Sequence, residues 1–347
     1  MIFPFGRQPL DKKLFCPSFL PILALLLSFA PIAVAAQALT EFSGRTMGTS
    51  YSVKFLGFRP VDFNTQLDGR LFMINQQMST YIAHSEISQF NRHAPQKWMT
   101  ISPEFWEVVE LAKDINLDTN GAFEPTLGSL VNMWGFGPDG RAIKIPSERM
   151  IQDELLKVGL HRVILGDGNK IRRTGLGFYF DLSAIAKGYA VDFVAKYLES
   201  LGVKDYMVEV GGEVRTKGVK KAGHPWKIGI EMPNGGRGPV MKVVAPGSNA
   251  VATSGDYRNY FERGGERFSH IIDPRTGRPI GHNLASVSVM AKSCAEADAL
   301  ATAFMVMGYE EAIKVVKKRN LGAMFILRNK SGFETRITDT FKPFIVD

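Results

Sequence analysis

Segments with strand patterns and segments with helix patterns follow one another here without a regular strand–helix–strand period, and this irregular order constrains the fold most. Alternating side chains around glycine turns predict strands in FSGRTMGTSYSVKF (42–55), KDYMVEVGGEVRTKG (204–218) and WKIGIEMP (226–233). SVSVMA (286–291) predicts another strand, and AMFILRNKSGFETRIT (323–338) a hairpin. Such an order is typical of an α+β fold.

Helices are predicted between these strands from apolar spacing and from their end signals. The segment 102–121 has Ser102 as a candidate N-cap, Pro103 at the first helical position and Gly121 just past its end. The segment 130–145 is predicted to be a glycine-containing loop that separates two lobes. The other predicted helices cover 64–79, 147–157, 185–201 and a segment that begins near Cys294.

The first 36 residues have the order of a secretory signal, and the remaining domain covers 37–347. A short basic segment precedes the apolar run FLPILALLLSFAPIAVAA, which ends in an Ala-x-Ala-like cleavage site at Ala33 to Ala36. This order predicts export to the periplasm, and an uncleaved N-terminal anchor is the alternative, since the run approaches the roughly 20 residues of a spanning helix. Cys16 precedes the apolar run, so the sequence has no lipid-modified cysteine at the end of the signal.

Charge and cysteine content narrow the classes of partner. The formal net charge is +8, but lysines and arginines are scattered, with KKAGHPWK and KVVKKR as small clusters. This distribution indicates a solvated surface and argues against a nucleic-acid partner. Beyond the signal only Cys294 remains, which excludes an internal disulfide and a thiolate metal cluster.

The segment SCAEADALATAF (293–304) is a small-residue apolar helix that contains a carboxylate, Asp298, with Thr302 one turn later on the same face. A buried unpaired carboxylate costs several kcal/mol, so a basic side chain, a neighbouring backbone or a metal ion must compensate it. A carboxylate and a hydroxyl at this spacing suit Mg²⁺. The alternative is that Asp298 caps a loop and Thr302 bonds its own helix.

Two further segments carry candidate chemistry. In DLSAIAKGYAVD (181–192) a helix begins beside Lys187, which suits a phosphate, although a plain strand-to-helix turn with a surface lysine explains the pattern too. In RFSHIIDPRTGRPI (267–280), His270 is a candidate general base or a structural histidine. DPRTGRP is predicted to be a turn.

Seven segments occur in the order seen in one family. They are MGTSYSV, MSTY, GAFEPTLGSLVNMWGFG, DLSAIAKGYAVD, VEVGGEVRTKG, FSHIIDPRTGRPI and SVSVMAKSCAEADALATAFMVMG. This combined pattern resembles the FAD:protein FMN transferases, the ApbE-type flavin transferases, over about residues 40–340.

The resemblance implies an exported, Mg²⁺-dependent α+β enzyme whose flavin site lies between two lobes. Such enzymes split FAD, attach FMN through a phosphoester to a Thr or Ser of an acceptor protein, and release AMP. The implied acceptors are subunits of membrane electron-transport complexes of the sodium-pumping (Nqr) or Rnf type, with a motif that resembles Asp-Gly-x-Ser/Thr. An FAD pyrophosphatase and a non-catalytic flavin carrier are the alternatives.

The resemblance also assigns residues. Asp298 and Thr302 match the family's side-chain metal ligands, Ala184 matches a ligand through its backbone carbonyl, and His270 matches a histidine that we interpret as the base. Glu124 stands where the family commonly has Asp, and Ser183-Ala184 where Gly-Gly or Gly-Ala is frequent. The positions that match FAD contacts are Met47, Tyr81, Ala122, Phe123, Glu124, Asp181, Lys187 and Ile272.

Overall fold

The computed structural model describes residues 38–57, 60–138, 140, 144–234 and 239–346. By their internal contacts, residues 36–347 group as one compact unit. The signal or anchor predicted for residues 1–36 lies outside the described residues. Within the described part of the chain, we find no helix whose length and hydropathy would let it cross a lipid bilayer.

An eight-stranded sheet organises the unit, and each pair of neighbouring strands in it is antiparallel. The strand patterns in the sequence predicted most of these strands. In sheet order they are β1 (Leu39–Thr46), β2 (Thr49–Leu56), β6 (Tyr206–Val210), β7 (Glu213–Lys217), β10 (Ala250–Gly255), β15 (Leu284–Ala291), β16 (Gly322–Asn329) and β17 (Gly332–Ile337).

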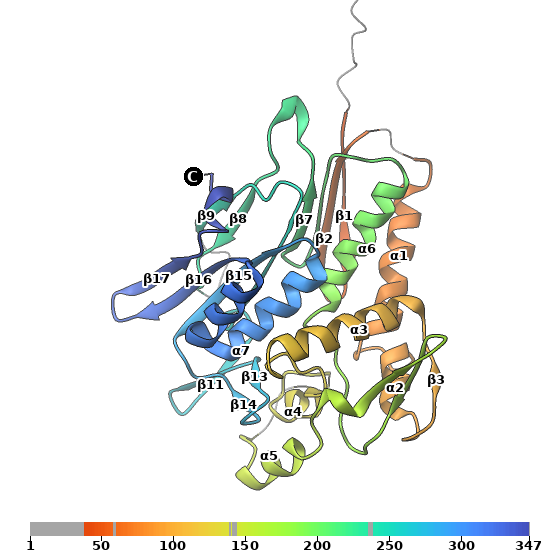
Figure 1. Ribbon diagram of the computed structural model, residues 1–347, viewed down its shortest axis with the longest axis vertical. Helices are drawn as coiled ribbons and strands as arrows, with labels where there is room; N and C mark the ends of the chain where they lie inside the picture. The colour runs from red at the N-terminus through yellow and green to blue at the C-terminus, as the bar shows by residue number, and fades with distance from the viewer. Residues whose placement is uncertain (1–37, 58–59, 139, 141–143, 235–238, 347) are drawn as a thin grey trace, which may run out of the picture. The chain divides into compact units, whose positions relative to one another are not determined.

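Both faces of this sheet are covered, which is why β15 is buried along its whole length. Because side chains alternate along a strand, Ala250 and Ala252 face α6 (Ala186–Ser200) and α7 (Cys294–Arg319), whereas Val251 faces the other way. On that second face, Val251 packs with Ile230 of β8 (Ile228–Glu231), which pairs with β9 (Val240–Val244). In Figure 1, α6 and α7 lie against the sheet, and α1 (Phe63–Met78) runs alongside α6.

The remaining elements form smaller units. Ser102 caps α3 (Pro103–Asp118) by accepting a hydrogen bond from the Phe105 N–H, as predicted. The loop predicted over 130–145 is wrong at its start, because residues 130–133 belong to α4 (Gly128–Met133). The smaller helices are α2 (Glu86–Arg92), α3 (Pro103–Asp118), α4 (Gly128–Met133) and α5 (Glu148–Leu155), and 3-10 turns cover Leu160–Arg162, Lys221–Gly223 and Lys342–Phe344. One small sheet has the order β3 (Met99–Thr100), β5 (Lys170–Arg173), β4 (Val163–Gly166). Two further sheets are the pairs β11 (Tyr260–Arg263) with β12 (Glu266–Ser269) and β13 (Ile272–Asp273) with β14 (Arg278–Pro279).

The α+β class predicted from the sequence is confirmed, and the two-lobe description stays a prediction.

Hydrogen bonds at two places hold together the elements that line the site. Asp192 of α6 accepts hydrogen bonds from the Ser293 hydroxyl and the Ala295 N–H at the start of α7. Trp134, just after α4, donates its indole N–H to the Gly277 carbonyl in the DPRTGRP turn.

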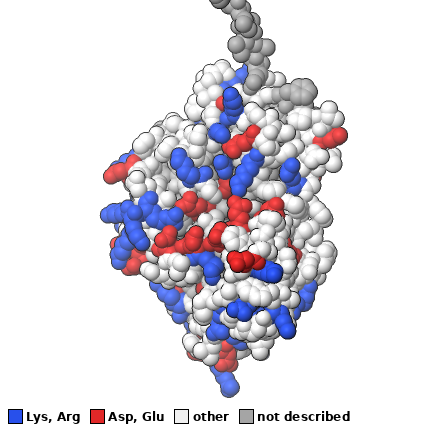
Figure 2. Space-filling view, turned by 45° about the vertical axis from the view of Figure 1, so that its right-hand side comes forward, with Lys and Arg blue, Asp and Glu red and all other residues white. Residues whose placement is uncertain are grey.

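On the face seen in Figure 2, acidic and basic side chains are interspersed, as the scattered charges of the sequence suggest.

Candidate active site

A cavity of about 1040 Å³ is lined by every residue that the sequence singled out for the site. The β1–β2 turn, the start of α6, the end of β10 and one face of α7 contribute to it. Their roles are still predictions, but residues up to 255 positions apart in the chain meet in one place. The predicted site residues in the lining are Met47, Tyr81, Ala122, Phe123, Glu124, Asp181, Ala184, Lys187, His270, Ile272, Asp298 and Thr302.

Asp298 is almost fully buried, with 2 % of its surface exposed. Its Oδ2 accepts a hydrogen bond of 3.0 Å from the Gly188 N–H, and its Oδ1 lies 3.7 Å from the Lys187 ammonium. A neighbouring backbone and a basic side chain therefore both compensate this carboxylate in part. Burial raises the pKa of Asp298, and Lys187 and the Gly188 N–H oppose that shift.

The Gly188 N–H lies in the first turn of α6, where backbone N–H groups have no acceptor within the helix. Asp298 supplies the acceptor that this group needs. Among the residues that the structure describes, no backbone N–H donates to the Ala184 carbonyl. Ala184 precedes the N-cap of α6, so its carbonyl oxygen takes no part in the helix and is available as a ligand in the cavity that Asp298 also lines.

Thr302 contributes a hydroxyl from the next turn of α7. Its Oγ1 lies 3.1 Å from the Ser254 Oγ at the end of β10, so the hydroxyl pairs across to the sheet. The alternative that Thr302 bonds its own helix is thus not the geometry observed. Carboxylate, hydroxyl and carbonyl oxygens are hard donors, which fit Mg²⁺ and leave positions for phosphate and water.

The charge in the cavity also favours a cation. An anionic ligand would be repelled by this lining unless positive charge accompanied it. No group of three or more His, Cys, Asp or Glu side chains within the described ranges is arranged to hold a metal. A metal here would therefore need the mixed oxygen donors above. The lining holds six carboxylates (Glu124, Asp181, Glu209, Glu213, Glu231, Asp298) and two lysine or arginine cations (Lys187, Arg258).

Glu213, which sequence reasoning missed, is the second buried carboxylate beside Lys187. Its Oε1 lies 3.4 Å from the Lys187 ammonium, and its Oε2 is buried without a hydrogen-bond partner among the residues that the structure describes. Burial raises the pKa of Glu213, with Lys187 opposing the shift. Burial alone would lower the pKa of Lys187, but Asp298 and Glu213 outweigh it and raise that pKa.

His270 is half-buried between β12 and β13. Its Nδ1 lies 3.0 Å from the Asn259 carbonyl, whose only role there is to accept, so Nδ1 carries the proton and Nε2 keeps a lone pair. Burial lowers the pKa of His270, and the bond to Asn259 opposes this. A neutral imidazole with a free Nε2 has the form that a general base requires.

Two tight turns approach the cavity from neighbouring hairpins. Met47 has φ 49° and Gly48 has φ 73°, and in the β6–β7 turn Gly211 and Gly212 have φ 64° and 104°. Left-handed backbone suits glycine, so Met47 is held in a conformation that costs of order 1 kcal/mol. A non-glycine residue kept there at a cavity wall is consistent with its predicted contact to a ligand.

The model of the ApbE family matches residues 47–325. A Vibrio cholerae protein named FAD:protein FMN transferase is 42 % identical over 332 residues, which cover 94 % of this chain and 99 % of the relative. The chain belongs to the ApbE family. A Haemophilus influenzae protein of the same name is 40 % identical, with 92 % and 95 % of the two chains covered.

Solved ApbE structures have the same fold. The apo form of the flavinyl transferase ApbE from Pseudomonas stutzeri superposes with a TM-score of 0.82 at 36 % identity, covering 90 % of this chain and 98 % of that one. The family resemblance stated from the sequence is confirmed, and with it the expectation that the chain is a transferase.

The Glu124 carboxylate accepts hydrogen bonds from neighbouring residues of the protein. Oε1 accepts from the Thr126 N–H and hydroxyl at 3.0 and 2.7 Å, and Oε2 accepts from the Leu160 N–H at 3.0 Å. The Asn116 amide donates to Oε2 as well, at 3.3 Å. These bonds make Glu124 a brace for the cavity wall at 122–128.

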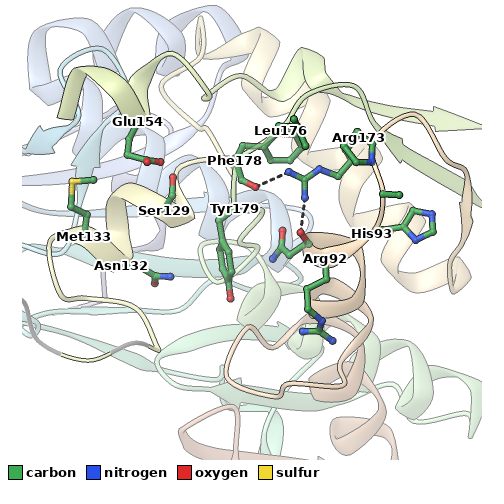
Figure 3. A pocket seen from close by; sticks show the side chains of 14 residues that line it. Arg92, His93, Ser129, Asn132, Met133, Glu154, Arg173, Leu176, Phe178 and Tyr179 are labelled. Atoms are coloured by element: carbon green, nitrogen blue, oxygen red, sulfur yellow. Dashed lines mark hydrogen bonds between the residues drawn. The ribbon is translucent and has the colours of Figure 1, made fainter. Parts of the chain in front are cut away.

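A second hollow of about 600 Å³ lies on the other side of α4 (Figure 3). Gly128 and Val131 line the larger cavity, whereas Ser129 and Asn132 line this one. Its buried Arg173 donates to the carbonyls of Asn91, Gly175 and Phe178. No predicted site residue lines it, so the larger cavity is the candidate active site of the ApbE fold.

Proposed function

We propose that this chain transfers FMN from FAD to a Ser or Thr hydroxyl of an acceptor protein, with Mg²⁺, and releases AMP. The observation that carries the proposal is the convergence of Asp298, Thr302, the free Ala184 carbonyl and His270 on one cavity. The names of the ApbE-family relatives support FMN transfer. Mg²⁺, the phosphoester and AMP rest on the donor set and on the family resemblance.

The reaction breaks the phosphoanhydride bond of the FAD pyrophosphate and forms a phosphoester bond to the acceptor. The acceptor oxygen attacks the flavin-side phosphorus, the bond to the bridging pyrophosphate oxygen breaks, and AMP leaves with that oxygen and its electron pair. His270 Nε2 accepts the hydroxyl proton, while the Asn259 carbonyl keeps the ring in the required tautomer. Bound at Asp298, Thr302 and Ala184, Mg²⁺ would supply charge neutralisation at the pyrophosphate.

The other lining residues bind and orient the flavin. Met47, Phe123 and Ile272 give the apolar surface that an isoalloxazine ring needs. Tyr81, 69 % exposed at the surface, is available to stack on it. Asp181, whose Oδ1 accepts the Ser183 N–H at 2.8 Å, braces the start of α6 next to Ala184.

We further propose that the protein is exported to the periplasm and works at the membrane on acceptor subunits of Nqr- or Rnf-like complexes. The basis is the N-terminal order of a signal and the resemblance to the family. The acceptor segment would carry a motif like Asp-Gly-x-Ser/Thr.

The test is to mix purified protein, FAD, Mg²⁺ and an acceptor fragment with that motif, and to examine a denaturing gel for flavin fluorescence. A fluorescent acceptor band that disappears with chelator supports the proposal. AMP without a fluorescent band indicates a pyrophosphatase, and neither product indicates a flavin carrier. Both of these outcomes contradict the proposal.

A further inference from the structure

The Lys187 ammonium is shared between two buried carboxylates. It lies 3.4 Å from Glu213 Oε1 and 3.7 Å from Asp298 Oδ1, and these two acidic side chains are 5 % and 3 % exposed. Charged hydrogen bonds between nitrogen and oxygen are normally about 2.7–2.9 Å long. Lys187 is therefore drawn toward both carboxylates without closing tightly on either.

Glu213 occupies its place at an energetic cost. It begins β7 directly after the Gly211-Gly212 turn, and one of its oxygens, Oε2, is buried with no hydrogen-bond partner in the described structure. Unsatisfied buried carboxylate oxygens are rare and call for an explanation. Its one ionic contact recorded among the described residues is Lys187, so the explanation must involve that lysine.

A lysine beside a metal ligand competes with the metal. Asp298 Oδ2 is occupied by the Gly188 N–H, which leaves Oδ1 as the oxygen for a cation, and Oδ1 is the atom that Lys187 approaches. Lys187 precedes Gly188 in α6, so its backbone is fixed close to Asp298. A second anion on the other side of the ammonium, such as Glu213, draws it away from Asp298.

We propose that Glu213 is a positioning residue for metal binding, which holds the Lys187 ammonium and so keeps Asp298 Oδ1 open to Mg²⁺. The inference rests on the proposed function, because it assumes that Asp298 is a metal ligand. Without the Glu213 carboxylate, Lys187 closes onto Asp298 as a direct ion pair, and Mg²⁺ must displace it. Residues that orient metal ligands typically change metal affinity by about 10–100-fold when they are replaced.

The test is a double-mutant cycle of Mg²⁺ affinity on the FAD-free protein, with Glu213→Gln, Lys187→Met and both together. Binding of Mg²⁺ alone is measured by calorimetry and by the shift of the thermal unfolding midpoint, at mildly alkaline pH where the Glu213 carboxylate is ionised. We expect Glu213→Gln to weaken Mg²⁺ binding about 10–100-fold. Lys187→Met should then restore most of that loss, although alone it changes the affinity much less.

Additive effects of the two substitutions on Mg²⁺ affinity would overturn the proposal. If the Glu213 charge acted on Mg²⁺ only through space, its removal would weaken binding by the same factor with or without the Lys187 ammonium. The matched control is Glu209→Gln, which removes a carboxylate from the same hairpin and cavity wall, where Glu209 accepts the Gly212 N–H. It should show no coupling with Lys187→Met. Coupling of equal size in the control also overturns the proposal.

Two outcomes separate this inference from the proposed function. If the native protein shows neither Mg²⁺ binding nor transfer, both are contradicted. If the native protein binds Mg²⁺ and Glu213→Gln binds it equally well, only the inference is contradicted. Should Glu213→Gln not fold, the same cycle is run with Glu213→Asp, which retracts the carboxylate from Lys187 by one methylene; additivity there again overturns the inference.

Discussion

Replacing Gly188 by alanine tests whether the close contact between α6 and α7 holds the site together. A Cβ at this position would lie 2.3 Å from the Cys294 carbonyl oxygen and 2.8 Å from the Ala295 Cα. Both atoms belong to the backbone at the start of α7, so no side-chain rotation relieves the clash. The helices must separate, and the Gly188 N–H then withdraws from Asp298.

The expected destabilisation follows from three contributions. Overpacking against backbone costs about 1–3 kcal/mol, and loss of a hydrogen bond to a charged group costs about 1.5–3 kcal/mol. Alanine gains about 1 kcal/mol over glycine in helix propensity. The net loss in the free energy of unfolding is about 1.5–5 kcal/mol.

Urea unfolding measures this loss as a lower midpoint with an unchanged m-value. The control is Gly69→Ala in α1, where an added Cβ meets nothing within 4 Å. This second substitution should stabilise the protein by about 0.4–1 kcal/mol. If Gly188→Ala is as stable as the native protein, the reasoning about the α6–α7 contact is refuted.

Three further predictions concern the chemistry. His270→Gln should lower the transfer rate constant by about 10²–10⁴-fold and leave the FAD dissociation constant nearly unchanged, and loss of FAD binding would contradict its role as base. Because burial lowers the pKa of His270 from its ordinary 6.5, the base stays unprotonated at neutral pH, and the acid limb of the pH–rate profile should have its midpoint below 6.5; a midpoint above that value argues against His270. Asp298→Asn keeps an oxygen for the Gly188 N–H but removes the charge, so both transfer and the Mg²⁺-induced shift in unfolding midpoint should vanish, whereas persistent Mg²⁺-dependent transfer would show that the metal binds elsewhere.

Local signals in the sequence predicted the secondary structure well. Ser102 and Pro103 mark the start of α3, and the apolar alternation of SVSVMA marks β15. These features depend on residues within a few positions of one another. The sequence did not predict α4, because Gly128 and the glycines that follow Met133 are typical of a loop. Gly128 is instead required by close packing, since a Cβ there would lie 2.4 Å from the Tyr179 side chain.

The sequence singled out candidate site residues but not the groups that position them. Asp298 and His270 stood out as polar residues in apolar segments. The Gly188 N–H lies 110 positions from Asp298, and the Asn259 carbonyl and the Glu213 carboxylate have no pattern that links them to their partners. Such contacts depend on how distant segments pack, so they become visible only in three dimensions.

The most direct test of the central claim is the molar ratio of AMP released to flavin bound covalently to the acceptor, with the native protein and with Asp298→Asn. The account predicts one AMP for each FMN on a Ser or Thr, in the native protein and only with Mg²⁺. AMP in large excess over acceptor flavin, or equal yields from Asp298→Asn, would contradict it.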